Sequence, residues 1–155
     1  MTEQAFAKTL AFPKPKKDGS GSTSQFSFSK DKDCGFMTLA KQKSDTSIED
    51  AKFNYDNKIS VKLSDKDMAC MIMVLMNKIP EINKGKGLFH QFKSVDINTT
   101  SIINLKKNEP KYGGFYLSVS KTTGEKKENI GTPITEDEAI VLGIVLRSMI
   151  EKIYE

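Results

Sequence analysis

The sequence contains few of the residues on which most catalytic and metal sites depend. Its 155 residues include no tryptophan, two cysteines, one histidine and, among 24 basic residues, a single arginine, Arg147. Cys34 and Cys70 lie far apart with no second soft ligand nearby, which argues against a zinc site or a disulfide framework and favours a reducing compartment. His90 has no cysteine or serine beside it with which to form a nucleophilic pair. We therefore expect a protein that is not an enzyme and that needs no metal ion or cofactor.

Long hydrophobic runs are also missing. No segment approaches the roughly 18 consecutive apolar residues of a transmembrane helix, and residues 1–7 contain Glu3 and no apolar signal-peptide core. We expect a soluble protein of the cytoplasm, or of the host cytoplasm if a phage encodes the chain.

Positive charge is present, almost entirely as lysine, and the formal net charge is +4. Lysine neutralises phosphate as a compact point charge, without the planar fork with which arginine reads guanine edges. This composition favours contact with a phosphate backbone over base-specific readout. A second explanation, which the sequence leaves open, is that an AT-rich genome supplies lysine in place of arginine.

Residues 1–24 are rich in proline, lysine, glycine and serine, and this composition predicts a flexible basic tail. The tail would either add an electrostatic contact to phosphates or only keep the protein soluble. We expect the remainder, residues 25–155, to form one domain.

An internal repeat is the most informative feature of the chain. Residues 59–67 align with residues 130–138, and in both copies an alternating strand leads directly into a helix start. Ser64 with Asp67, and Thr135 with Glu138, predict two capping boxes. The acids 136–138 are therefore better explained as helix N-terminal charges than as catalytic carboxylates.

The two expected helices are apolar on nearly every side, over residues 68–76 and 139–146. Such a helix has to be covered all round, and these runs are too short to cross a bilayer. We expect the helices to pack against each other between sheets. Because two helices can hardly cover each other completely, we also expect the protein to associate with itself.

Each helix is preceded by room for four strands. In the first repeat, residues 25–80, the pattern predicts strands over 25–30, 36–43, 51–55 and 58–63. In the second repeat, residues 87–155, it predicts strands over 88–94, 100–108, 113–122 and 127–134. The expected fold class is therefore α+β, with two tandem ββββα units whose antiparallel sheets pack around two central apolar helices.

This organisation resembles the Whirly proteins, which are related to the positive cofactor four type of transcriptional coactivator and to kinetoplast guide-RNA-binding proteins. The resemblance covers residues 25–155 and rests on the architecture and on segments 59–79 and 130–150; small phage-encoded members look similar too. It implies binding of single-stranded nucleic acid across the outer sheet faces and association through the helices into homodimers or homotetramers. The Lys-Gly-Lys-Ala-Ala-Leu motif of plant Whirly proteins is absent, and residues 84–88 are only a loose echo of it, so plant-type contacts cannot be transferred one for one.

Binding of single strands without sequence preference requires a basic path for phosphates and flat rings on which bases stack. The expected strands supply both, although lysines occur on any solvated sheet face and rings more often pack a core. Tyr116 is better placed, because its neighbours on the same face, Ser118 and Ser120, are small and polar. The candidate nucleic-acid-binding residues are Lys41, Lys43, Lys58, Lys62, Lys93, Lys106, Lys107, Lys121, Tyr55, Tyr116, Phe36 and Phe89.

The sequence thus favours a largely sequence-independent single-stranded DNA-binding protein that acts in DNA replication, recombination or transcription. Two alternatives stay open at this stage. One is an RNA-binding protein with the same fold, and the other is an oligomeric scaffold protein whose lysines only maintain solubility.

Overall fold

The computed structural model describes residues 9–43 and 52–155, and in this part of the chain two four-stranded antiparallel sheets are each followed by one long helix. The first unit consists of β1 (Leu10–Lys14), β2 (Ser22–Phe28), β3 (Gly35–Lys41), β4 (Ile59–Leu63) and α1 (Asp65–Leu75). The second consists of β5 (Leu88–Lys93), β6 (Asn98–Lys107), β7 (Phe115–Thr123), β8 (Lys126–Ile134) and α2 (Glu136–Ile153). Within each sheet the strands are neighbours in chain order. The expected fold class of two tandem ββββα units is confirmed.

The first sheet differs from the expectation in two strands. β1 lies inside residues 1–24, where we expected only a flexible tail, and Phe12 of this strand is buried against Phe26 of β2 with ring centroids 6.3 Å apart. Pro13 is tolerated there because β1 is an edge strand, on which a missing N–H is not needed for pairing. The expected strand over 51–55 is absent from its described part: Phe53 makes only an isolated bridge to Gln42. Residue 51 and residues 1–8 lie outside the described residues.

Both expected capping boxes are present. The Ser64 hydroxyl accepts from the Asp67 backbone N–H at 3.2 Å, and the Asp67 carboxylate accepts from the Ser64 N–H at 2.9 Å. Thr135 and Glu138 make the same exchange at the start of α2, at 3.4 and 2.9 Å. Each cap stabilises its helix by about 1 kcal/mol.

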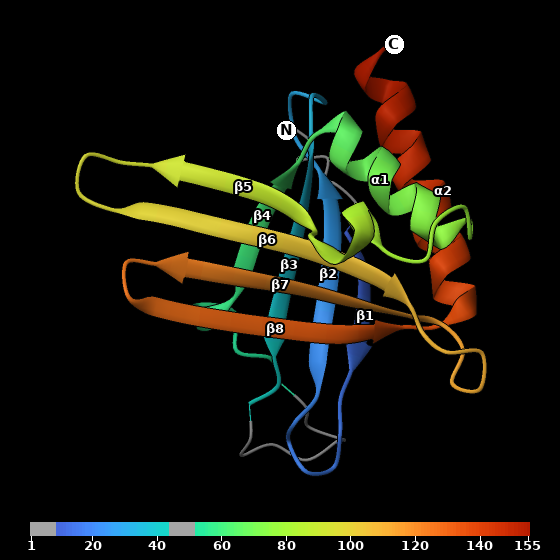
Figure 1. The fold of residues 1–155 in the computed structure, drawn as a ribbon, viewed down its shortest axis with the longest axis horizontal. Coiled ribbons are helices and arrows are strands. Elements are labelled where there is room, and N and C mark those ends of the chain that lie inside the picture. Colours follow the sequence, from blue (N-terminus) through green and yellow to red (C-terminus); the bar gives the residue numbers. More distant parts are fainter. Residues whose placement is uncertain (1–8, 44–51) are drawn as a thin grey trace, which may run out of the picture.

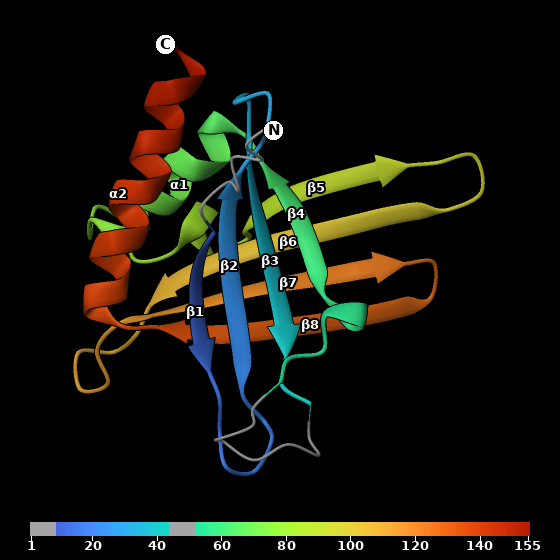
Figure 2. The ribbon, with the colours of Figure 1, turned by 180° about the vertical axis from the view of Figure 1, so that it is seen from behind.

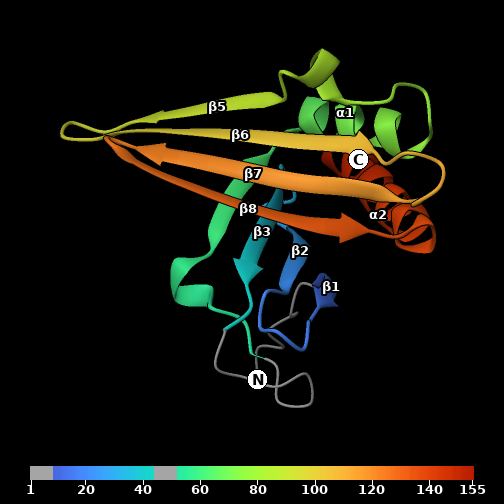
Figure 3. The same ribbon diagram turned by 60° about the horizontal axis from the view of Figure 1, so that its bottom comes forward.

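The two sheets lie across one another as two layers (Figure 3). α1 and α2 lie side by side at one end of the second sheet, opposite the tips of the β5–β6 and β7–β8 hairpins (Figure 1). Strand alternation sets what is buried: Ile59, Val61 and Leu63 of β4 face the core while Ser60 and Lys62 face outward. The same alternation buries Phe115, Leu117 and Val119 of β7. One core cluster therefore joins both sheets and both helices.

The described part of the chain does not cover the helices all round. Met71, Val74, Leu142 and Leu146 are buried, but the outer sides of both helices carry exposed apolar side chains. These are Met73, Met76, Ile140, Val141 and Ile144. The sheets and the partner helix reach only one side of each helix, so the described residues leave these side chains exposed to solvent.

No helix in the described residues is both long enough and apolar enough to span a lipid bilayer.

Candidate nucleic-acid interface

A groove lies where the second sheet extends past the edge of the first. The hairpins β5–β6 and β7–β8 project beyond β4 (Figures 1 and 2). The first sheet therefore does not cover the part of the second sheet's inner face that lies past β4. The groove has a volume of about 370 Å³, and we call it the inter-sheet groove. Its lining residues are Ser60, Val61 and Lys62 of β4, His90, Gln91 and Phe92 of β5, Thr99 and Ser101 of β6, and Lys121 of β7.

Strand register explains why polar residues gather in this groove. On the inner face of the second sheet, His90 pairs with Ser101, and Ser101 pairs with Lys121 on its other side. Two residues further along the same strands this face carries Ile103 and Val119, which are buried under the first sheet. The face therefore changes from apolar to polar where the cover ends, and it presents Lys121 across from Lys62 of β4.

His90 lies beside the residue that completes the cap of α1. Its Nε2 atom lies 3.0 Å from Oδ2 of Asp67, the same oxygen that accepts the Ser64 backbone N–H. Asp67 is buried, whereas about a third of the His90 side chain is exposed. The imidazole thus lies between the groove and the helix start, next to a buried carboxylate.

Phe92 contributes an exposed ring to the same groove. Its side chain is 69% exposed, and its strand partner is Thr99. Sequence reasoning did not select Phe92 or assign His90 a binding role. A signal was available, because strand alternation places Phe89 and Phe92 on opposite faces, so one of the two rings had to lie on the inner face.

A second hollow, of about 330 Å³, lies near the start of β4. Lys41, Asn54 and Asn57 line it from the first unit, and residues 127–130 line it from β8. The pKa of the nearby Glu128 carboxyl is lowered, first by the hydrogen bond and charge of Lys126 and then by the charges of Lys121 and Lys41. The positive charge of Lys41 and Lys121 therefore reaches the same stretch of β8.

The outer face of the first sheet adjoins the groove through Lys62. Phe36 of β3 pairs with Lys62 of β4 in register, and one step further the hydroxyls of Thr38 and Ser60 are hydrogen bonded at 2.9 Å. Tyr55 lies over this face, where its hydroxyl accepts a hydrogen bond from the Gln25 amide at 2.8 Å. Both rings are partly exposed, and Lys58 lies on the same side of β4.

The remaining candidates lie elsewhere. Tyr116 and Lys106 pair in register on the outer face of the second sheet, which is the side away from the first sheet, and Phe89 and Lys93 share that face on β5. Lys107 lines a small hollow beside Tyr112, and Lys43 follows the end of β3. The structure therefore brings together Lys58, Lys62, Lys121, Phe36 and Tyr55, with Lys41 nearby, and separates the other six.

Two tandem ββββα units with crossing antiparallel sheets define the Whirly-like fold. Solved structures with this fold match nearly the whole chain at low sequence identity. WHY3 from Arabidopsis thaliana is 11% identical with a TM-score of 0.63, and the match covers 96% of this chain and 89% of that one. A guide-RNA-binding protein complex bound to a gRNA is 13% identical with a TM-score of 0.62, covering 95% and 92%. The plant transcriptional regulator PBF-2 is 13% identical with a TM-score of 0.59, covering 95% and 83%.

No protein-family model matches the chain, and no curated protein matches it by sequence. The likeness is therefore one of fold.

Proposed function

We propose that this protein binds single-stranded nucleic acid, with DNA as the preferred ligand, along the inter-sheet groove and the adjoining outer face of the first sheet. The observation that carries the proposal is that Lys62 and Lys121, from different sheets, line one groove together with the exposed ring of Phe92. Phosphates need the cations and bases need the ring, and stacking of a base on an aromatic side chain contributes about 1–3 kcal/mol.

The shape of the surface favours a flexible strand over a duplex. The path turns from the outer face of the first sheet into the angle between two crossing sheets, and duplex DNA, with a persistence length of about 150 base pairs, resists such local bending. The scarcity of arginine supports backbone contacts without guanine readout. A sequence-tolerant binder of this kind would serve DNA replication, recombination or transcription.

RNA is the second candidate ligand. The guide-RNA-binding complex of similar fold is the observation in its favour. Competition between DNA and RNA oligonucleotides of matched sequence decides between the two.

The direct test is a fluorescence-anisotropy titration of a labelled oligo-dT across a salt series. We expect the logarithm of affinity to fall with the logarithm of salt concentration by about 0.7 for each phosphate contact, and we expect duplex of the same length to bind much more weakly. The double variant Lys62→Ala/Lys121→Ala should bind more weakly. The slope of its log affinity against log salt concentration should be smaller by about 0.7 for each lysine removed.

The matched control is Lys66→Ala/Lys78→Ala, which removes the same charge at two exposed lysines outside the groove. Equal affinity for duplex and single strand, or equal losses in the two double variants, would contradict the proposal.

We further propose that the protein forms homodimers or homotetramers through its helices. A shallow apolar hollow runs between α1 and α2, lined by Ile72, Leu75, Met76, Ala139, Ile140, Gly143, Ile144 and Arg147. Exposed apolar patches of this kind mark association surfaces in otherwise polar proteins.

A further inference from the structure

Tyr116 leans across the outer face of the second sheet onto the neighbouring strand. Its register partner on β8 is Pro133, but the hydroxyl end of its ring lies over Gly131, two residues along that strand. A β-carbon placed on Gly131 would lie 2.0 Å from Oη, 2.4 Å from Cζ and 2.7 Å from Cε2 of Tyr116. These distances are far inside van der Waals contact. Only glycine therefore leaves room for the ring in this position.

Backbone conformation does not explain this glycine. Gly131 lies in the middle of β8 and, unlike Gly124 in the preceding turn, has no positive φ. Glycine inside a strand lowers stability, because it adds chain entropy to the unfolded state and contributes no side chain to the sheet. The close approach of Tyr116 explains the glycine, because glycines inside strands often mark places where another group comes close to the backbone.

The surroundings of the ring suit a nucleobase. Because its far end rests on β8, the Tyr116 ring extends along the sheet surface instead of standing away from it, and 40% of the residue is exposed. Ser118 and Ser120 on the same face are small, and Lys106 is the register partner of Tyr116 on β6. A supported ring with a cation beside it is the combination that binding of a base and its phosphate requires.

The internal repeat gives this position a counterpart in the first sheet. When the repeats are aligned, Lys62 corresponds to Pro133 and Ser60 to Gly131. Phe36, which pairs with Lys62, is therefore the equivalent of Tyr116, and the two residues are equally exposed. Each sheet thus presents one ring at the same place in its unit, but only the second sheet has a glycine beneath it.

We propose that Gly131 is a positioning residue that holds Tyr116 as a base-stacking platform, which gives the protein a second contact for a single strand on the face away from the groove. The proposal rests on the proposed function. The hollow beside Lys41 is lined by Asn129 on the edge strand β8, two residues from Gly131.

A double-mutant cycle with oligo-dT tests the positioning role. Tyr116→Ala should lower affinity at least about fivefold, because one stacked base is lost, whereas Tyr116→Phe should bind like wild type. Gly131→Ala should fold normally, because only the far end of a flexible side chain has to move, and it should lose as much affinity as Tyr116→Ala. The double variant Tyr116→Ala/Gly131→Ala should lose no more than either single variant.

Tyrosine emission supplies a second measurement that a purely structural role would not alter. The chain has four tyrosines and no tryptophan. Saturating oligo-dT should quench wild type more than Tyr116→Phe, and Gly131→Ala should show the smaller quench. Thr122→Ala, further along the same face of β7, is the control and should behave as wild type.

The outcomes separate the two proposals. If Gly131→Ala still loses affinity in the Tyr116→Ala background, or if Tyr116→Ala binds like wild type, the stacking role of Tyr116 on Gly131 is wrong. The proposal that the groove binds a single strand would be unaffected. If wild type does not bind the single strand at low salt, the proposed function itself fails.

Discussion

At the scale of single residues, the sheet interface contains buried hydroxyls that have no partner. Thr132 and Ser24 are fully buried core residues on β8 and β2, and neither hydroxyl has a hydrogen-bond partner among the described residues. A buried polar group without a partner lowers stability by about 1–3 kcal/mol. The repeat shows that the site does not need the hydroxyl, because Val61 occupies the position equivalent to Thr132.

We therefore expect Thr132→Val to raise the free energy of unfolding by about 1–2 kcal/mol, since the shape is kept and the unpaired hydroxyl is removed. Urea denaturation monitored by circular dichroism measures the change. Thr38→Val is the matched control: Thr38 lies on the outer face and its hydroxyl is bonded to that of Ser60, so no gain is expected there. A loss of stability in Thr132→Val would show that its hydroxyl is paired.

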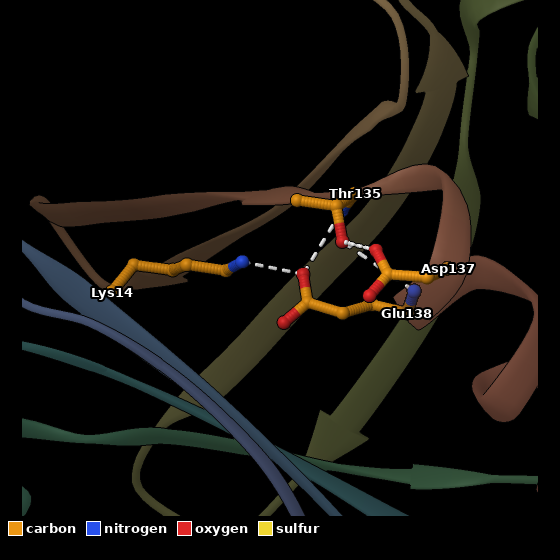
Figure 4. A network of polar contacts seen from close by, with 4 residues as sticks. All are labelled: Lys14, Thr135, Asp137 and Glu138. Carbon is orange, nitrogen blue, oxygen red and sulfur yellow. Dashed lines mark hydrogen bonds and ion pairs between the residues drawn. The ribbon is translucent and has the colours of Figure 1, made fainter.

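At the scale of elements, the start of α2 is fastened to the edge strand β1. Lys14 of β1 forms an ion pair with Glu138, the residue that also closes the capping box with Thr135 (Figure 4). Burial raises the pKa of the Glu138 carboxyl, but hydrogen bonds from Lys14 and Thr135 outweigh burial and hold it below the ordinary value of 4.5. The first strand and the last helix are thereby linked by a charge-assisted bond.

This depressed pKa predicts how stability changes with pH. The Glu138 carboxylate takes up a proton at a higher pH in the unfolded chain than in the folded chain. The contribution of the ion pair to folding stability is therefore complete above pH 4.5, and it is lost as pH falls through the pKa of the folded state. In Glu138→Gln, which keeps a residue able to complete the capping box, we expect lower stability near pH 7 and a difference from wild type that shrinks below 4.5. Urea denaturation at several pH values measures both curves.

Glu125→Gln in the exposed β7–β8 turn is the control for loss of a carboxylate. Curves for Glu138→Gln and wild type that remain parallel down to acid pH would contradict the role of the Lys14–Glu138 pair.

At the scale of the whole molecule, the apolar outer side of the helices is separate from the polar groove. Ile144 is 64% exposed on α2, on the side that faces neither sheet. In a single chain, an aspartate at this position would be exposed to water and would have little effect on stability. Between two copies, the same substitution would bury an unpaired charge, which is strongly unfavourable.

We expect wild type to show, in light scattering coupled to size exclusion, a mass that is a multiple of the 17.3 kDa chain. Ile144→Asp should shift the protein toward a single chain. Val95→Asp at the fully exposed tip of the β5–β6 hairpin makes the same chemical change away from the helices and should keep the wild-type mass. A wild-type monomer at all concentrations would overturn the proposed association.

Much of the fold could be predicted because its signals are local. The capping residues lie three positions apart, and the alternation of Ile59, Val61 and Leu63 assigns the faces of β4 without knowledge of any other strand. β1 could not be predicted in this way. It has five residues, includes Pro13 and lies among lysine, glycine and serine, and it becomes a strand because Phe12 packs on Phe26 of the neighbouring strand.

The sequence by itself determined two strand-cap-helix units, which faces of their strands are wet, and a lysine-rich surface, because these depend on periodicity and on neighbours a few residues apart. Only the tertiary structure decided that the sheets cross, that Lys62, His90, Phe92 and Lys121 line one groove, and that Tyr116 rests on Gly131 on the other side. The physical reason is that contacts between residues of different layers depend on the angle at which the two packed layers cross. That angle follows from the fit of the entire core, and no local pattern of residues encodes it.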